Sequence, residues 1–242
     1  MSTPAVTEVV YGRNPVRELL AAGRRPAHRI AALPQLVGEP WLAGAGVPVR
    51  TADRAELGRL AGTSDHQGVV AEAGPYPYVQ ASPLLREEGP LVCLDGAQDP
   101  RNIGAVARVA EAGGAAGLVI PGRGSPGVTA VVCKASAGAV EHLLVNRTDG
   151  LIGLLHDARG MGRIVAGADA DAPGVVDHGD AGLPIDTILV LGAEGSGLRP
   201  RVRDACDVLV RIPMRGRVAS LNLSVAAGIL LFDLPRPPIA QR

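Results

Sequence analysis

The chain has 242 residues, with 24 acidic and 24 basic side chains and a formal net charge of zero. This balance excludes the strongly basic surface on which non-specific binding of nucleic acid depends. Aromatic residues make up only 2% of the chain, which excludes the base-stacking platforms of RRM and OB folds. We therefore expect any flat ligand to be held by backbone groups and aliphatic side chains.

Cysteines, histidines and apolar runs bear on the compartment and on metal binding. The three cysteines lie far apart and form no C-x-x-C pair, which is typical of a reducing compartment. The five histidines show no metal-ligand spacing. The N-terminus shows no apolar signal core, and no apolar run reaches the ~18 residues of a membrane span. We expect a cytoplasmic protein with no metal site and no membrane contact.

A Pro-rich stretch that starts at Gly74 divides the chain into two units. We expect an N-terminal domain over residues 1–73, a linker over 74–88 and a second domain over 89–242. The N-terminal pattern predicts a small α/β unit, with Asn14 capping its first helix and Asp53 or Thr51 capping its second. Its predicted helices and strands lie, in chain order, at residues 15–22, 28–33, 47–50, 53–60 and 68–71.

The second unit alternates strands with helices. Such alternation predicts an α/β fold whose mostly parallel sheet is covered on both faces by helices. The predicted strands lie at residues 91–94, 118–120, 163–166, 187–191 and 208–212. The predicted helices lie at residues 102–112, 129–139, 151–159 and 221–233.

Residues 122–127 match the G-x-G-x-x-G pattern of dinucleotide-binding proteins. The pattern follows the second strand of its unit, and Pro126 stands where a helix should open. Glu141, the acid at the expected distance, ends a helical stretch instead of a strand, where it would meet a ribose. A loop is the better interpretation.

The segment from Asp95 to Arg108 joins the first strand of the second unit to a helix. We expect Asn102 to cap this helix and Gly104 to permit close approach of another backbone. Arg108 shares a helix face with Gly104. A helix N-terminus beside an arginine suits a phosphate or a developing oxyanion, although this segment alone also fits a capped helix with a surface arginine.

Two later segments also follow predicted strands. Residues 189–198 end a buried strand in a glycine-rich turn that contains Glu194, and such turns bind ligands at the carboxyl edge of α/β sheets. Residues 210–226 lead through an Ile-Pro-Met turn into an apolar helix. We expect Ser220 to cap this helix, with Asn222 in its first turn, so simple helix capping remains an alternative reading.

Together these segments resemble the SpoU (TrmH-like) family of RNA ribose 2′-O-methyltransferases in the knotted SPOUT superfamily. Four motifs carry the resemblance: N-x-G-x-x-x-R at 102–108, S-x-G-A-x-E at 136–141, G-A-E-G at 192–195, and I-P-M followed by S-L-N-x-S-x-A within 212–226. Residues 11–20 and 66–69 are similar to the substrate-binding domain of the bacterial branch that acts on a 23S rRNA guanosine.

The resemblance implies a C-terminal parallel-sheet domain with a deep trefoil knot and a small N-terminal α/β substrate-binding domain. It implies S-adenosyl-L-methionine (AdoMet) as cofactor, bound at the knot, with rRNA or tRNA as substrate. The implied cofactor-binding residues are Leu191, Gly192, Ile212, Met214 and Leu221. The implied catalytic residues are Arg108, Asn102, Glu194, Ser220 and Asn222.

The family also implies a homodimer in which an arginine of one subunit completes the site of the other. The expected dimer surfaces are residues 221–234 and 100–116. A guanidinium is never neutral under ordinary conditions, so we expect Arg108 to bind the adjacent phosphate and stabilise the developing alkoxide. A phosphate oxygen or water would then accept the proton.

Three alternatives stay open. The first is a tRNA or antibiotic-resistance rRNA methyltransferase of the same fold. The second is a non-catalytic RNA-binding protein, against which the intact set of predicted catalytic residues argues. The third is a nicotinamide oxidoreductase, which depends only on the glycine pattern at 122–127.

Overall fold

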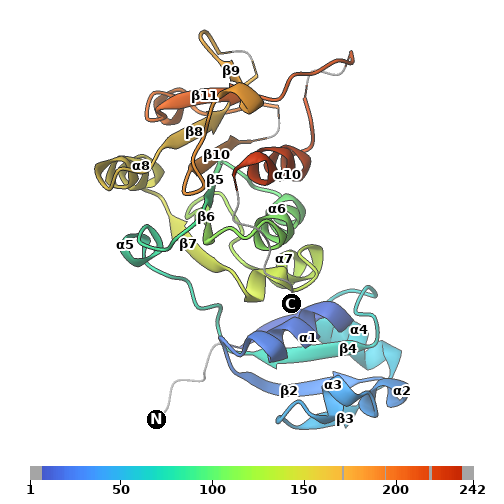
Figure 1. Ribbon diagram of the computed structural model, residues 1–242. Coiled ribbons are helices and arrows are strands. Elements are labelled where there is room, and N and C mark those ends of the chain that lie inside the picture. Colours follow the sequence, from blue (N-terminus) through green and yellow to red (C-terminus); the bar gives the residue numbers. More distant parts are fainter. Residues whose placement is uncertain (1–6, 171, 194, 218–219, 236–242) are drawn as a thin grey trace.

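The computed structural model describes residues 7–170, 172–193, 195–217 and 220–235, and contains two separate sheets (Figure 1). The first sheet has the order β1-β4-β2-β3, in which β2 and β3 are parallel and the other pairs antiparallel. Its strands are β1 (Glu8–Tyr11), β2 (Ala27–Ala32), β3 (Val49–Thr51) and β4 (Val69–Ala73). The helices are α1 (Arg13–Ala22), α2 (Pro34–Val37), α3 (Pro40–Ala43) and α4 (Arg54–Ala61). We call residues 8–73 the first unit.

The second sheet has seven strands in the order β7-β6-β5-β10-β8-β11-β9, all parallel. Its strands are β5 (Leu91–Asp95), β6 (Gly117–Pro121), β7 (Leu144–Thr148), β8 (Val165–Ala168), β9 (Val176–Asp177), β10 (Ile188–Gly192) and β11 (Val208–Arg211). The helices are α5 (Ala81–Leu84), α6 (Pro100–Ala112), α7 (Ala130–Ala135), α8 (Leu151–Gly160), α9 (Pro200–Arg203) and α10 (Leu223–Asp233). Two short 3₁₀ helices are η1 (Ala139–Glu141) and η2 (His178–Asp180). We call residues 91–233 the second unit, and the α/β class with a parallel sheet is confirmed.

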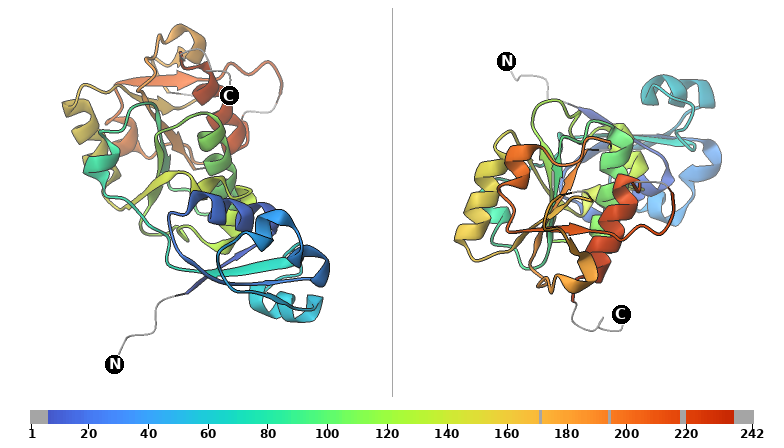
Figure 2. Two further views of the ribbon diagram at one scale, coloured as in Figure 1. Left: turned by 60° about the horizontal axis from the view of Figure 1, so that its bottom comes forward. Right: turned by 90° about the horizontal axis from the view of Figure 1, so that it is seen from above.

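Helices cover both faces of the second sheet, with α6 and α10 on one face and α8 on the other (Figures 1 and 2). Successive residues of a strand point to opposite faces, and the buried clusters follow this period. Val92 and Leu94 of β5 pack in the cluster that includes α6 and α10. Leu91 and Cys93 pack in the cluster that includes α8. Both faces of β5 are therefore buried, which explains why its first four residues are all apolar.

The two central strands set the place of a ligand site. The chain moves outward from β5 to β6 and β7 on one side, and β10 lies on the other side of β5. Asp95 at the end of β5 lies opposite Gly192 at the end of β10. Loops at the carboxyl ends of these strands therefore diverge at a topological switch point, where open α/β sheets bind ligands.

Three predicted helix caps are wrong. Helix α6 begins at Pro100, because Asp99 accepts a hydrogen bond from the amide of Arg101 at 2.8 Å, so Asn102 is already inside the helix. Helix α10 is capped by Asn222 instead of Ser220, and α1 begins after Gly12 with no side-chain cap instead of at Asn14. Of the two candidates for the cap of α4, Asp53 is the one that caps it.

The helix predicted over 129–139 is also shorter than expected. It ends at Ala135, because Ala137 and Gly138 adopt positive φ angles of 53° and 90° that no α-helix accommodates. Residues 122–127 lie outside any helix or strand, as predicted for a loop. The domain boundaries at 73 and 89 stay a prediction, and the segment between them contains α5 and the buried Tyr76.

Helix α10 is largely apolar, and two of its large apolar side chains remain exposed. Val225 is 49% exposed and Phe232 is 55% exposed. An apolar helix that keeps such side chains in water is typical of an interface. In the described part of the chain, no helix combines the length and apolar character that crossing a membrane requires.

Gly104 permits close packing of α6 on α7, as the sequence predicts. A Cβ at this position would lie 2.6 Å from the Cβ of Ala135 and 2.7 Å from the carbonyl oxygen of Val132. Both atoms belong to a helix that is fixed on its other side, so neither moves easily. The packing of these two helices therefore requires glycine here.

We expect Gly104→Ala to destabilise the fold by about 1–3 kcal/mol, because overpacking outweighs the gain in helix propensity. Gly228→Ala in α10 is the matched control, since its Cβ would meet only Val109 Cγ1, at 3.5 Å. The control should gain up to about 1 kcal/mol. Urea denaturation of both variants checks this. An equal gain in the two variants would contradict the tight packing.

Candidate active site

A cavity of about 390 Å³ lies at the carboxyl ends of β8, β10 and β11. Its walls come from three segments that lie far apart in the sequence. All five predicted cofactor-binding residues line it: Leu191, Gly192, Ile212, Met214 and Leu221. Ser220, one of the predicted catalytic residues, lines the same cavity. Its size is that of an ordinary small-molecule site.

Backbone atoms shape the wall beside β10. Gly197 donates its amide hydrogen to the carbonyl oxygen of Ala193 at 2.9 Å, which closes the turn after the strand. Gly195 and Gly197 have φ angles of 82° and 65°, which favour glycine. A Cβ on Gly192 would lie 2.1 Å from the carbonyl carbon of Gly197 and 2.4 Å from the amide nitrogen of Leu198. The closed turn therefore requires glycine at residue 192.

A second cavity, of about 500 Å³, adjoins the first at the ends of β5 and β10. Asn102 lines it, and the two cavities share the wall formed by Ala193, Ser196, Gly197 and Leu223. The predicted cofactor residues thus lie on one side of a shared wall, with Asn102 on the other. The two groups of predicted residues therefore line neighbouring cavities.

Asn222 links the apolar helix to α6. Its Oδ1 accepts hydrogen bonds from the amide of Ser224 at 2.9 Å and from the hydroxyl of Ser224 at 2.7 Å. Its Nδ2 donates to Oδ1 of Asn102 over 3.5 Å. Two predicted catalytic residues, 120 positions apart in the sequence, are therefore in contact.

We expect Asn222→Ala to lower the free energy of unfolding by about 1 kcal/mol, because the helix loses its cap. Ser220→Ala should change it by less than about 0.5 kcal/mol, because Ser220 is exposed and precedes the helix. Chemical denaturation of both variants separates the two caps. A larger loss for Ser220→Ala would contradict the observed helix start.

Arg108 lies apart from both cavities. Its side chain is exposed on α6, six residues beyond Asn102, which is about 9 Å along the helix axis. It forms no hydrogen bond or ion pair with the described residues, and it lines neither cavity. Glu194, the remaining predicted catalytic residue, lies outside the described residues.

Two charged pairs at these cavities were not predicted from the sequence. Asp95 is almost fully buried in the second cavity and accepts from Arg199, at 2.6 Å from Nε and 2.8 Å from the amide. Asp169 lies 2.6 Å from Nη2 of Arg203, and both line the first cavity. Their place in the chain could have indicated them, because Asp95 and Asp169 each stand at the carboxyl end of a strand, where α/β sheets bind ligands.

The chemistry of the first cavity fits AdoMet. The apolar part of its lining is aliphatic, with no aromatic side chain among the described residues, so an adenine would rest on Leu and Ile side chains. The adjacent charges of Asp169 and Arg203 suit the ammonium and carboxylate of an amino acid. Among the described residues, no group of His, Cys, Asp and Glu side chains is arranged to hold a metal ion.

Comparison with known families decides the identity. Residues 89–232 match the model of the SpoU rRNA Methylase family. The chain belongs to the SpoU rRNA methylase family. Residues 9–79 match a second model, described as RNA 2′-O ribose methyltransferase substrate binding. The SpoU model covers the seven-stranded sheet with both cavities, and the second model covers the first unit.

Individual SpoU relatives extend the match to nearly the whole chain. An uncharacterized tRNA/rRNA methyltransferase of Mycolicibacterium vanbaalenii is 40% identical over 95% of this chain and 76% of its own length. The AdoMet-bound rRNA methyltransferase of Sinorhizobium meliloti has a TM-score of 0.77 at 25% identity, over 94% of this chain and 86% of its own. The SpoU methyltransferase AviRb of Streptomyces viridochromogenes has a TM-score of 0.78 at 25% identity, over 94% and 88%.

This SpoU family member is therefore an AdoMet-dependent RNA methyltransferase. The first cavity, at the carboxyl edge of the matched sheet, has the size and lining for that cofactor. RNA as the substrate agrees with the model matched by the first unit.

Proposed function

We propose that the protein methylates a ribose 2′-hydroxyl of RNA, on a guanosine of 23S rRNA. The observation that carries the proposal is the pair of adjoining cavities, one lined by the predicted cofactor residues and the other by Asn102. The ribose 2′-O position is supported by the description of the family model at residues 9–79. The guanosine of 23S rRNA is supported by the resemblance of residues 11–20 and 66–69 to that branch.

AdoMet, when bound, supplies an electrophilic methyl group on a sulfonium. Leu191, Ile212, Met214 and Leu221 hold its apolar parts, and the turn after Gly192 offers backbone groups to its polar atoms. We place this site at the predicted trefoil knot. An aliphatic lining agrees with the expectation from composition that aliphatic side chains, and not aromatic ones, hold a flat ligand.

Arg108 binds the phosphate next to the reacting ribose and stabilises the alkoxide that develops on the 2′-oxygen. Its guanidinium stays charged, so it acts electrostatically while a phosphate oxygen or water takes the proton. Asn102 and Asn222, which are in contact, orient the ribose from the second cavity together with Glu194. Ser220 orients the loop that borders the cofactor cavity.

A homodimer explains why Arg108 lies away from the cavities of its own chain. In the dimer, Arg108 of one subunit reaches the cavities of the other. The apolar α10, with Val225 and Phe232 exposed, packs on α6 and supplies the interface together with residues 100–116. Exposed arginines then gather in one groove for RNA: Arg101, Arg108, Arg123, Arg201, Arg215 and Arg217.

We place the reaction in the cytoplasm, because the three cysteines are free and RNA is the substrate.

A transfer assay with tritiated AdoMet on separate pools of 23S rRNA, 16S rRNA and tRNA tests the substrate. We expect label in 23S rRNA. Label in tRNA alone would favour a tRNA methyltransferase of the same fold. No label in any pool would overturn the proposed function.

A further inference from the structure

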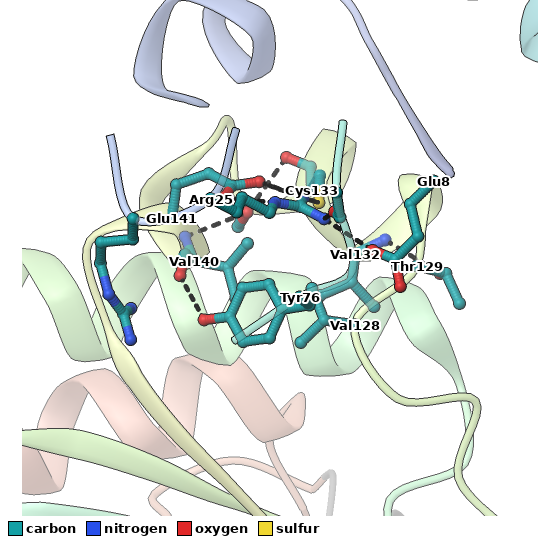
Figure 3. A network of polar contacts seen from close by, with 12 residues as sticks. Glu8, Arg25, Tyr76, Val128, Thr129, Val132, Cys133, Val140 and Glu141 are labelled. Carbon is teal, nitrogen blue, oxygen red and sulfur yellow. Dashed lines mark hydrogen bonds and ion pairs between the residues drawn. The ribbon is translucent and has the colours of Figure 1, made fainter. Parts of the chain in front are cut away.

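Residues of both units meet in one buried polar network, drawn in Figure 3. Arg25, just before β2 in the first unit, makes a two-pronged contact with Glu141 at the end of η1. Nε lies 3.0 Å from Oε2, and Nη2 lies 2.5 Å from Oε1. The two side chains are only 2% and 1% exposed. The proposed mechanism uses neither residue.

The rest of the Arg25 guanidinium contacts the first sheet and the segment between the units. Nη1 donates to Oε2 of Glu8 at 2.6 Å and to the carbonyl oxygen of Gly74 at 3.2 Å. The ring of Tyr76 lies under the guanidinium, with its centroid 5.3 Å from Cζ. One buried cation therefore joins β1, the connecting segment and the second unit.

Tyr76 itself is anchored to the second unit. Its hydroxyl lies 2.7 Å from the carbonyl oxygen of Val140 and 3.1 Å from that of Leu143. Arg24 also donates to the carbonyl oxygen of Leu143. Burial raises the pKa of Tyr76, so the hydroxyl keeps its proton and remains a donor at neutral pH.

A second contact between the units lies beside this network. A Cβ on Gly138, which has a φ of 90°, would come within 2.6 Å of the Cβ of Glu18 and 3.0 Å of the Cα of Pro15. His142 Nε2 lies 3.0 Å from Oε2 of Glu18. Helix α1 of the first unit is therefore in direct contact with the segment that carries Glu141.

Helix α7 lies between the contact of the two units and α6, the helix that carries two of the predicted catalytic residues. Cys133, whose Sγ lies 3.6 Å from Nη2 of Arg25, belongs to α7. Helix α7 packs tightly on α6 at Gly104, and α6 carries Asn102 and Arg108. Any rotation of the first unit about this contact changes the distance from its surface to the cavities.

A buried ion pair is not in itself a large source of stability, because apolar residues of the same volume often do as well. A two-pronged arginine–carboxylate contact does require a fixed relative orientation of its partners. Units joined by a polar interface without such a contact generally move relative to each other. The Arg25–Glu141 pair therefore fits a role in fixing geometry.

We propose that Arg25 and Glu141 are positioning residues that lock the first unit on the second in one orientation. RNA held by the first unit then meets the two cavities at a set distance. This inference rests on the proposed function in one respect, that the first unit binds the substrate RNA.

The test replaces the pair by apolar residues of similar volume, Arg25→Met with Glu141→Leu, which removes both fully buried charges together. Glu8, the other carboxylate partner of Arg25, is 34% exposed and so stays solvated. The distance between the units is measured by double electron–electron resonance. The spin labels are attached at two exposed positions, Arg59→Cys in α4 and Met161→Cys after α8. The native thiols react slowly, because two are buried and burial raises the pKa of Cys206 to about 12. AdoMet affinity, measured by calorimetry, shows that the second unit is folded.

We expect a narrow distance distribution in the wild type and a broad one in the double variant, at equal AdoMet affinity. KM for RNA should rise about tenfold while kcat changes little, because orientation is lost before the chemical step. Arg25→Lys, which keeps the charge without the two-pronged contact, should give an intermediate KM.

The control is Arg29→Met with Glu72→Leu, an exposed pair joined at 2.8 Å across β2 and β4 of the first sheet. It should leave the distance distribution narrow. A narrow distribution in the Arg25/Glu141 variant, or a broad one with unchanged KM, would overturn the inference. The distance measurement needs no RNA, so failure of the wild type to methylate RNA would count against the proposed function alone.

Discussion

Arg108→Lys is expected to lower kcat for methyl transfer by about two orders of magnitude, the usual effect of removing one donor from an oxyanion site. Lysine keeps the charge but loses the planar fork that binds a phosphate and an adjacent oxygen together. AdoMet affinity should be unchanged, because Arg108 lines neither cavity of its own chain and is proposed to contact the RNA phosphate instead of the cofactor. Single-turnover kinetics with calorimetry measures both. Arg86→Lys, also exposed, is the control and should keep the wild-type rate.

Full activity of Arg108→Lys would remove Arg108 from the mechanism. The dimer form of the mechanism has a separate test, in which an Arg108→Ala chain is mixed with a Gly192→Ala chain. If Arg108 acts across the interface, the mixed dimer contains one site with an intact cavity and an intact arginine, so activity returns. If Arg108 acts within its own chain, every site lacks one of the two, and the mixture shows no activity beyond that of the two variants alone.

Gly192→Ala is expected to weaken AdoMet binding at least about tenfold, which corresponds to about 1.4 kcal/mol. The added Cβ would lie 2.1 Å from Gly197 and 2.4 Å from Leu198, both backbone contacts, so the turn must open. The turn forms part of the cavity wall, and its displacement changes the backbone groups offered to the cofactor. Titration calorimetry with AdoMet measures the loss.

Gly153→Ala in α8 is the control for this substitution, because its Cβ would meet no atom within 4 Å. Its AdoMet affinity should equal that of the wild type. Wild-type affinity in Gly192→Ala would mean that the cofactor does not use this cavity. A loss of the fold in Gly192→Ala, visible by circular dichroism, would call for the same titration at a lower temperature at which the variant is folded.

Much of the fold could be predicted because both faces of the second sheet are buried, and strands buried on both faces appear in the sequence as short apolar runs. The apolar runs at β5 and β10 define those strands to within one residue. Helix starts were less predictable, because several capping residues compete: Asp99 precedes Asn102, and Asn222 follows Ser220. Strand β7 (Leu144–Thr148) was missed, since its apolar residues give way to Asn146 and Arg147 within the strand.

Part of the candidate site could also be predicted from the sequence, and part could not. The predicted cofactor residues share a cavity because they lie at or beyond the carboxyl ends of β10 and β11, and parallel strands end at one edge. Pairs such as Asp95–Arg199 and Arg25–Glu141 could not be predicted, because their partners lie 104 and 116 positions apart. From the sequence alone a charged residue is interpreted as exposed to solvent, and only the fold shows which residue it pairs with.

The most direct test of the central claim is the position of the transferred methyl group. A 2′-O-methyl group blocks alkaline cleavage of the adjoining phosphodiester, because that cleavage needs the free 2′-hydroxyl. After transfer from tritiated AdoMet to 23S rRNA and alkaline hydrolysis, we expect the label in an alkali-resistant dinucleotide that begins with guanosine. Label released in mononucleotides, as from a methylated base, would contradict the account.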